Sequence, residues 1–284
     1  MVEIAIMGYG VVGSGVAEVL SNHTENIAKR AKEEIRIKYI LDLKEFLEDP
    51  LADRFTKSFD DILNDPEVKI VVEVMGGLHP AYEFVRSCLL AGKSVVTSNK
   101  ELVAAKGADL LALAQKQNLN FLFEASVGGG IPIIRPMSQC LAANDVIEID
   151  GILNGTTNFI LTKMIRDQMD FDDALALAQK LGYAEHNPAA DVEGMDACRK
   201  ICILASLAFG KHVYPDQVHT EGITKVTLAD VEYAEVWGGV IKLIGRVKIL
   251  ENDQIHIMVC PMFVPRSSQL ATVDDVFNLS LIHI

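Results

Sequence analysis

The sequence predicts an α/β protein with a doubly wound parallel sheet, followed by a second α+β domain. Three patterns in the 284-residue chain support this prediction. In the first half, short apolar runs alternate with helical patterns, as in chains whose parallel strands are joined by helices. A glycine-rich turn directly follows the first apolar run. Later the alternation stops, and helices are followed by two long strand-like runs. We therefore expect two domains, at 1–132 and 133–284.

The first domain is expected to alternate strands and helices with right-handed crossovers. Its run 68–75 is almost continuously apolar, which is typical of a strand buried on both faces. We expect strands at 2–7, 35–41, 68–75, 94–97 and 120–123. We expect a first helix after the glycine turn, with Val16, Val19 and Leu20 at helical spacing, out to about Arg30. Further helices are expected at 60–63, 80–91 and 102–117, the last with a break at Gly107.

The second domain is expected to mix helices with a hairpin. Glu251-Asn252-Asp253 separates two strand-like runs and is a hairpin signal. We expect strands at 147–153, 240–250 and 254–260. We expect helices at 156–166, 171–181 and 195–209, the last capped near Asp191.

Composition and charge exclude several classes of protein. Half of the residues are hydrophobic, which suits a packed core and not a disordered chain. The formal charge of −13 repels nucleic acid and anionic lipid. No apolar stretch approaches the ~18 residues of a membrane helix. We expect neither a nucleic acid nor a membrane as partner.

The cysteines and the N-terminus predict a cytoplasmic protein. The five cysteines are an odd number and are scattered, as is typical of reduced thiols. Cys198 and Cys202 are four residues apart, but no second pair accompanies them, so buried thiols are favoured over a metal site. Met1 is followed by a strand-like run and not by a basic leader.

The glycine-rich turn has the spacing Gly8-x-Gly10-x-x-Gly13 between a strand and a helix. This context is typical of a Rossmann-type dinucleotide site. Gly8 permits a tight turn, Gly10 lets the backbone approach a pyrophosphate, and Gly13 lets the helix pack closely on the sheet. The alternative is a glycine-rich turn without a ligand.

Asp42 ends the second predicted strand, where an acidic residue can bind the cofactor ribose. A carboxylate there accepts hydrogen bonds from a 2′-hydroxyl and repels a 2′-phosphate, so Asp42 favours NAD over NADP. Lys44 nearby can offset this preference. The alternative is a solvated carboxylate in a turn.

Two lysines are candidates for site chemistry. Lys100 follows a strand at the carboxyl edge, where doubly wound sheets bind ligands. Asp196 and Lys200 lie four residues apart at the start of an apolar helix, so they share a face. A lysine flanked by carboxylates near the core is a candidate proton-transfer group. The alternatives are a surface lysine and an ordinary surface ion pair.

Several motifs in order resemble homoserine dehydrogenase, from residue 2 to about residue 279. The glycine fingerprint is common to many dehydrogenases, whereas the last three motifs are specific. The motifs are Gly8–Gly13, Val95–Lys100, Phe123–Pro132, Gly151–Asn158 and Gly182–Lys200.

The resemblance implies nicotinamide-dependent interconversion of L-homoserine and L-aspartate 4-semialdehyde, on the route to threonine and methionine. It implies Lys200 as general acid/base, Lys100 between cofactor and reacting oxygen, and Asp196 as the residue that orients substrate and Lys200. The implied substrate-binding residues are Glu185, which holds the substrate ammonium, with Asp191, Gly155, Thr156 and Tyr183. The implied cofactor-binding residues are Gly8, Gly10, Val11, Val12, Gly13, Asp42, Ser98 and Lys100.

The resemblance also implies a monovalent cation site, for an ion such as Na⁺. Glu124 and the backbone carbonyls of Val127, Gly129 and Ile131 match the family's ligands. Oxygen ligands suit a hard cation. The alternative is a plain hinge between domains.

The chain departs from the family pattern in its last part. Ser268-Gln269 replaces a His-Pro pair, and no regulatory module follows. The apolar run Phe277–Ile284 ends the chain where the family continues, so we expect a C-terminally truncated or frame-shifted form. Apolar residues on both faces of the predicted strands of the second domain, together with the resemblance, lead us to expect a homodimer.

Two other functions are alternatives to homoserine dehydrogenase activity. A truncated, non-catalytic dinucleotide-binding protein would explain the glycine turn, but the lysines and carboxylates of the site are all present. An aspartate-semialdehyde dehydrogenase would need a cysteine nucleophile, and none of the five cysteines has an evident nucleophilic context.

Overall fold

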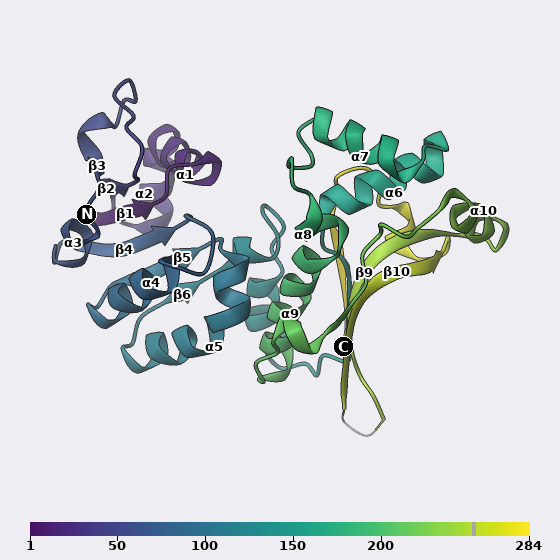
Figure 1. The fold of residues 1–284 in the computed structure, drawn as a ribbon. Coiled ribbons are helices and arrows are strands. Elements are labelled where there is room, and N and C mark those ends of the chain that lie inside the picture. The colour runs from purple at the N-terminus through teal and green to yellow at the C-terminus, as the bar shows by residue number, and fades with distance from the viewer. Residues whose placement is uncertain (252–253) are drawn as a thin grey trace. The chain divides into compact units, whose positions relative to one another are not determined.

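The computed structural model describes residues 1–251 and 254–284. The chain divides into two compact units, Met1–Gly129 and Gly130–Ile284, where the sequence predicted domains at 1–132 and 133–284 (Figure 1). We call them unit 1 and unit 2 and describe each by itself.

Unit 1 is built on a parallel sheet with strand order β3-β2-β1-β4-β5-β6. Every neighbouring pair is parallel, as predicted for a doubly wound sheet. The strands are β1 (Val2–Met7), β2 (Ile35–Leu41), β3 (Phe55–Thr56), β4 (Val68–Glu73), β5 (Ser94–Thr97) and β6 (Phe121–Leu122). Strand β3 was not predicted, because two residues are too short to show an alternation.

The helices of unit 1 connect these strands, and in Figure 1 α1 and α2 lie on one side of the sheet and α4 and α5 on the other. They are α1 (Val11–Asn22), α2 (Thr24–Ala31), α3 (Phe59–Leu63), α4 (Ala81–Leu90) and α5 (Lys100–Lys116), with short 3-10 turns at Ala52–Arg54 and Glu124–Ser126.

Two helix predictions in unit 1 are wrong. The single helix predicted to run out to about Arg30 is divided at His23, where the Thr24 hydroxyl donates to the carbonyls of Leu20 and Ser21. Such side-chain bonds compete with the regular helix pattern. Gly107 does not interrupt α5, which continues through it to Lys116. The glycine is buried, and a Cβ there would lie 3.2 Å from the Val103 side chain.

Unit 2 contains a mixed sheet with strand order β11-β7-β9-β10-β8. The strands are β7 (Glu148–Ile152), β8 (His219–Thr220), β9 (Gly239–Ile249), β10 (Ile255–Pro265) and β11 (Leu279–His283). Strands β9 and β10 pair antiparallel along their whole length. Of the predicted turn between them, Asn252 and Asp253 lie outside the described residues.

The helices of unit 2 include those predicted, with one correction. They are α6 (Gly155–Asp167), α7 (Phe171–Lys180), α8 (Ala189–Val192), α9 (Met195–Phe209) and α10 (Leu228–Val236), with short turns at Pro136–Cys140, Pro215–Gln217 and Gln269–Thr272. The cap predicted near Asp191 is wrong. Asp191 belongs to the separate helix α8, and α9 begins after Gly194, whose φ of +84° suits glycine.

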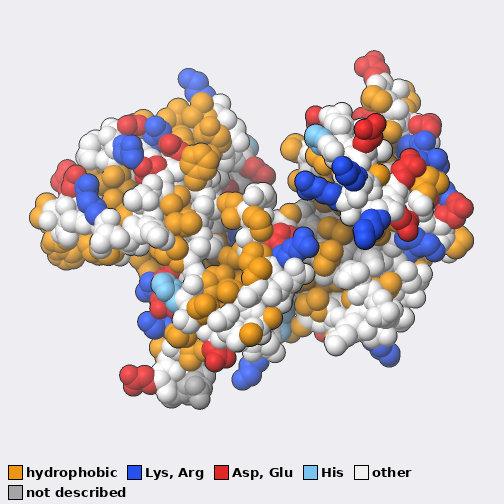
Figure 2. Space-filling view, turned by 180° about the vertical axis from the view of Figure 1, so that it is seen from behind, with side chains coloured by type: hydrophobic (Ala, Val, Ile, Leu, Met, Phe, Trp, Pro, Cys, Tyr) orange, Lys and Arg blue, Asp and Glu red, His pale blue; other side chains and the backbone are white. Residues whose placement is uncertain are grey.

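The surface carries both signs of charge in spite of the net charge. Figure 2 shows acidic and basic side chains interspersed over the visible face, with hydrophobic side chains gathered in several patches. In the part of the chain that the structure describes, no helix is long and apolar enough to cross a membrane. The five cysteines are free thiols.

Candidate functional site

The glycine turn between β1 and α1 depends on its glycines in different ways. Gly8 has a φ of +98°, which disfavours any side chain. A Cβ on Gly13 would lie 2.0 Å from the carbonyl oxygen of Gly8, so the helix packs against the turn at this point. A Cβ on Gly10 would meet no atom within 4 Å, and its φ is −77°. The space beside Gly10 is therefore open to a ligand.

Asp42 directly follows β2 and is hydrogen-bonded to the glycine turn. Its Oδ2 accepts the backbone N–H of Tyr9 at 2.8 Å, and its Oδ1 accepts the N–H of Lys44 at 2.9 Å. These two bonds hold the carboxylate beside the turn. Each carboxylate oxygen can accept more than one hydrogen bond, so the group can also receive a ribose hydroxyl.

The start of α1 suits an anionic group. Among the residues that the structure describes, no side chain caps this helix, so its first N–H groups and its partial positive charge face outward. Val11, its first residue, is 92% exposed. The open space at Gly10, the uncapped helix start and Asp42 together fit the pyrophosphate and ribose of a dinucleotide.

A buried hydrogen-bond network holds the carboxyl ends of β4 and β5. Glu73 is fully buried, and its carboxylate accepts the N–H of Met75 at 2.9 Å and the hydroxyl of Thr97 at 2.6 Å. The Thr97 hydroxyl accepts the N–H of Asn99 at 2.9 Å, and the Asn99 side chain caps α5 by accepting the N–H of Leu102 at 3.1 Å. The network fixes the start of α5, whose first residue is Lys100.

Ser98 is half-buried between β5 and α5, directly before this cap. The structure thus gathers the predicted cofactor residues of unit 1 at the carboxyl edge of its parallel sheet, which is the edge where such folds bind ligands. Glu73 and Thr97 were not identified as site residues from the sequence. A carboxylate inside an otherwise apolar strand was the signal that could have revealed them.

The lysine and the carboxylate of α9 form an ion pair in unit 2. Lys200 Nζ lies 2.9 Å from Oδ2 of Asp196 and donates to the carbonyl of Leu153 at 2.7 Å. Asp196 is only 2% exposed, and the Lys200 side chain is largely buried. A buried ammonium beside a buried carboxylate can hold and transfer a proton, whereas an exposed surface pair contributes little.

Asn154 joins the two predicted aspartates. Its Nδ2 donates to Oδ1 of Asp191 at 2.7 Å and to Oδ2 of Asp196 at 2.9 Å. Its Oδ1 accepts the N–H of Thr157 at 2.8 Å and so caps α6. Asn154 was not among the predicted site residues. The helix-start pattern Asn154-Gly-Thr-Thr marked it as a cap, but the two aspartates are too distant in sequence to be linked to it.

The remaining predicted substrate residues lie around the start of α6 and the turn after α7. Thr156 donates its hydroxyl to the carbonyl of Tyr183 at 2.7 Å. Gly155 opens the helix, and the Tyr183 ring lies 5.0 Å from that of Phe159. Glu185 is exposed in the turn that follows. Unit 2 therefore presents a lysine, three carboxylates and a hydroxyl on α6, α8, α9 and one turn.

This arrangement suits a small zwitterionic substrate. Carboxylates can accept the hydrogens of an ammonium group, and the lysine can donate to an oxygen that gains negative charge.

The predicted cation ligands lie in the stretch of sequence where unit 1 ends and unit 2 begins. Glu124, Val127 and Gly129 belong to unit 1, and Ile131 belongs to unit 2. The backbone carbonyl of Glu124 accepts the N–H groups of Val127 and Gly128. Over residues 1–251 and 254–284, no three His, Cys, Asp or Glu side chains cluster as metal ligands. That result does not test a site made of backbone carbonyls, which stays a prediction.

Comparison with known proteins assigns both units to one family. A family model described as homoserine dehydrogenase matches residues 132–284, and one described as the NAD binding domain of homoserine dehydrogenase matches residues 8–124. A homoserine dehydrogenase of Lactococcus lactis subsp. lactis is 41% identical over 282 residues. That match covers 98% of this chain and 66% of the relative, so the chain spans just under two thirds of the relative's length.

Solved structures of homoserine dehydrogenases also match this chain. A crystal structure of a homoserine dehydrogenase from Thiobacillus denitrificans matches with a TM-score of 0.95 and 42% identity, covering 99% of this chain and 65% of that one. A hyperthermophilic archaeal homoserine dehydrogenase in complex with NADPH matches with a TM-score of 0.83 and 27% identity, covering 99% of this chain and 87% of that one.

Proposed function

The chain belongs to the homoserine dehydrogenase family, and on that premise we propose that it catalyses the nicotinamide-dependent interconversion of L-homoserine and L-aspartate 4-semialdehyde. The observation that carries the proposal is the buried Lys200–Asp196 pair, which Asn154 connects to Asp191. A chain that only bound a dinucleotide would not need this cluster. The reaction belongs to the synthesis of threonine and methionine.

Lys200 is the general acid and base of the proposed reaction. In the reducing direction its ammonium gives a proton to the substrate oxygen while the oxygen gains charge, and in the oxidising direction its amine takes the hydroxyl proton. Asp196 and the carbonyl of Leu153 hold Nζ in place by short contacts of 2.9 and 2.7 Å. A bound nicotinamide supplies or accepts the hydride.

The carboxylates of unit 2 bind the substrate ammonium. Glu185 is exposed in the turn after α7 and is the proposed counter-charge. Asp191, held by Asn154 at 2.7 Å, supports it. Gly155, Thr156 and Tyr183 line the same site, since the Thr156 hydroxyl is bonded to the Tyr183 backbone.

Unit 1 binds the cofactor through the glycine turn, the start of α1 and Asp42. Contacts are proposed with Gly8, Gly10, Val11, Val12, Gly13, Asp42, Ser98 and Lys100. Lys100 donates to the reacting oxygen or to the cofactor. We propose NAD as the preferred cofactor, because the Asp42 carboxylate favours a 2′-hydroxyl over a 2′-phosphate. The NADPH complex of the archaeal relative makes NADP the necessary comparison.

Na⁺ or another monovalent cation is proposed at Glu124 and the carbonyls of Val127, Gly129 and Ile131. A cytoplasmic location is proposed as well, because the reduced cysteines and the biosynthetic reaction suit that compartment.

A homodimer is proposed through the sheet of unit 2. One face of β9 packs on α9, where a Cβ on Gly245 would lie 3.3 Å from Ile201. On the other face, Ile152 and Ile244 form a cluster with several half-buried apolar residues, including Leu279. A second copy would cover the half-buried residues of this cluster. Sedimentation at micromolar concentration tests this, and a monomeric mass contradicts it.

The function is tested by measuring the absorbance of reduced nicotinamide with L-homoserine and NAD or NADP in turn. We expect turnover with L-homoserine and none with L-serine, whose hydroxyl is one carbon closer to the ammonium. Cofactor binding without turnover would instead identify a non-catalytic dinucleotide-binding protein.

A further inference from the structure

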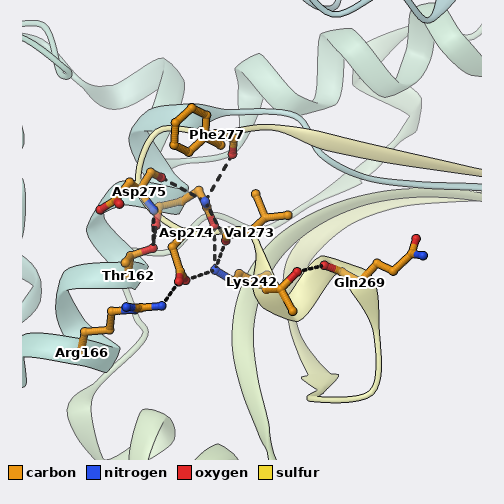
Figure 3. Close-up of polar contacts among 10 residues, drawn as sticks. Thr162, Arg166, Lys242, Gln269, Val273, Asp274, Asp275 and Phe277 are labelled. Atoms are coloured by element: carbon orange, nitrogen blue, oxygen red, sulfur yellow. Dashed lines mark hydrogen bonds and ion pairs between the residues drawn. The ribbon is translucent and has the colours of Figure 1, made fainter.

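Strand β9 carries a lysine at a position that is as buried as its apolar neighbours. Lys242 is 1% exposed, while Leu243 and Ile244 beside it are also buried. Its Nζ donates to the carbonyl of Val273 at 2.5 Å and to Oδ1 of Asn158 at 3.0 Å, and it lies 3.5 Å from Oδ1 of Asp274. Figure 3 shows the lysine reaching from β9 into the loop that contains Val273 and Asp274.

The segment Val273–Phe277, which we call the late loop, is held by the same group of residues. Nδ2 of Asn158 donates to the carbonyls of Val273, Asp275 and Phe277 at 3.0 to 3.3 Å. The N–H of Asp275 donates to the Thr162 hydroxyl at 3.1 Å. Carbonyl oxygens of three alternate residues thus converge on the Asn158 amide, and the first of them, that of Val273, also accepts from the Lys242 ammonium.

An ion pair also anchors the late loop to α6. Arg166 of α6 pairs with Asp274, as Figure 3 shows. Asp275 has a φ of +54°, in the left-handed region that aspartate adopts more readily than most residues with a side chain. The contacts made by Asn158, Thr162 and Lys242 hold the loop in this conformation.

The late loop packs directly on the first residue of α6. A Cβ on Gly155 would lie 2.6 Å from the carbonyl oxygen of Val276. Gly155 is flanked by Asn154, which holds Asp191 and Asp196, and by Thr156, which is bonded to Tyr183. The late loop therefore packs against the start of α6, next to the proposed substrate residues.

Packing alone does not explain a lysine at this position. Burial of an ammonium group costs several kcal/mol, and apolar residues in place of a whole buried ion pair are often neutral or stabilising, whereas loss of one partner alone is destabilising. Burial lowers the pKa of Lys242, and the neighbouring carboxylate of Asp274 acts in the opposite direction. An apolar residue would leave Oδ1 of Asn158 without the lysine donor and would remove one of the two donors to the Val273 carbonyl, so the lysine selects one conformation of the loop.

We propose that Lys242 is a positioning residue for the substrate site: by holding the late loop against Gly155, it sets the place of Asn154 and Thr156 at the start of α6. This inference rests on the proposed function, because it concerns the binding of L-homoserine. It adds a residue that contacts neither substrate nor cofactor.

The test compares Lys242→Met with Lys93→Met. Lys93 is the matched control, because it is also buried and also donates to two carbonyls, those of Asp65 and Val68, in unit 1. Both variants should lower the melting temperature. At a temperature where all forms are folded, Lys242→Met should raise the KM for L-homoserine about tenfold, because small displacements at a site are costly. Its Kd for the cofactor should stay within about twofold of the wild type, since no cofactor contact is altered.

Two further measurements separate positioning from stability. Hydrogen exchange of peptides covering 154–158 should be faster in Lys242→Met than in the wild type and unchanged in Lys93→Met. In Lys242→Ala, added propylammonium should lower the raised KM, because the cation can occupy the space beside Val273 and Asn158.

An unchanged KM and unchanged exchange at 154–158 in folded Lys242→Met would overturn the inference. A wild-type protein that fails to oxidise L-homoserine would instead refute the proposed function. In that case the exchange at 154–158 alone decides whether Lys242 positions the start of α6.

Discussion

The side-chain amide of Asn154 donates to Oδ2 of Asp196 at 2.9 Å, although 42 residues separate the two in the chain. Asp196 also pairs with Lys200, so one carboxylate oxygen serves both the cap of α6 and the proposed proton-transfer group. The same amide reaches Asp191 at 2.7 Å. Helices α6, α8 and α9 are therefore tied together at the residues that the reaction requires.

Asn154→Ala should reduce both stability and activity. The variant loses a helix cap, which costs about 1 kcal/mol. It also removes a hydrogen bond from the buried Asp196 carboxylate, which costs a further ~1–3 kcal/mol. We expect kcat/KM for L-homoserine to fall by about 100-fold, because Asp191 and Lys200 lose their alignment. Denaturant unfolding and steady-state kinetics measure the two effects.

Asp170→Ala provides the matched control for this variant. Asp170 caps α7 by accepting the N–H of Asp173 at 2.9 Å and has no proposed role at the site. The Asp170→Ala variant should lose a similar contribution of the helix cap to stability and should keep the wild-type kcat/KM for L-homoserine. If both variants lost activity in proportion to stability, Asn154 would be a cap and nothing more.

Lys200→Met should abolish most of the turnover. Positioned proton transfer contributes ~10²–10⁴-fold, so kcat should fall within that range while the Kd of the cofactor changes little. Lys163→Met is the control, since Lys163 also forms an i,i+4 ion pair, in the reverse order, with Asp167 on α6 at 3.0 Å. Unimpaired turnover in Lys200→Met would remove this lysine from the mechanism.

Glu185→Gln should weaken substrate binding more than cofactor binding. The substitution keeps the size of the side chain and removes the proposed counter-charge of the substrate ammonium. We expect the KM for L-homoserine to rise about tenfold, the scale of a lost charge-assisted hydrogen bond. Fluorescence titration with the cofactor is the companion measurement, and a defect confined to the cofactor would contradict the assignment.

Much of the fold could be predicted because its signals are local. Strands β2 and β5 were predicted with their observed bounds, since each is a short apolar run between turn residues. Asp42 was predicted to end the second strand and bind the cofactor ribose. The Tyr9–Asp42 hydrogen bond shows that it lies beside the glycine turn, and the ribose contact stays a prediction. The predicted parallel topology is also confirmed.

The other features depend on contacts between distant residues. The division of α1 and α2 at His23 follows from side-chain bonds to the backbone, whereas apolar periodicity continues through it. Asn154 was identifiable as a cap but not as the link between two aspartates. Lys242 lies 84 residues from Asn158, and a lysine inside a strand pattern gives no sign of its partner.

Gly13→Ala and Gly10→Ala should have opposite consequences. An alanine methyl at Gly13 would overlap the Gly8 carbonyl at 2.0 Å, so this variant should be strongly destabilised without any ligand. An alanine at Gly10 meets no protein atom within 4 Å, so the apo protein should keep its stability. If a pyrophosphate approaches Gly10, Gly10→Ala should weaken cofactor binding. Full affinity in this variant would show that the ligand does not use that space.

The raised pKa of Tyr9 predicts that the protein loses stability at alkaline pH. Burial, together with the hydrogen bond from its hydroxyl to Asp49 at 3.0 Å, raises the pKa of Tyr9 to about 12 from its ordinary value of 10.0. Between these two values the unfolded chain releases the phenolic proton while the folded chain retains it. The contribution is therefore complete below pH 10 and decreases as the pH rises toward 12. This contribution to the free energy of unfolding amounts to at most ~3 kcal/mol, at about 1.4 kcal/mol per unit of pKa.

Because Tyr9 lies in the glycine turn, its ionisation should also weaken cofactor binding. Tyr9→Phe keeps the ring contacts with Phe46 and Phe55 and removes the titrating group. Denaturant unfolding at several pH values above 9 should show a steeper decline for the wild type than for Tyr9→Phe, and parallel curves would exclude Tyr9 as the cause.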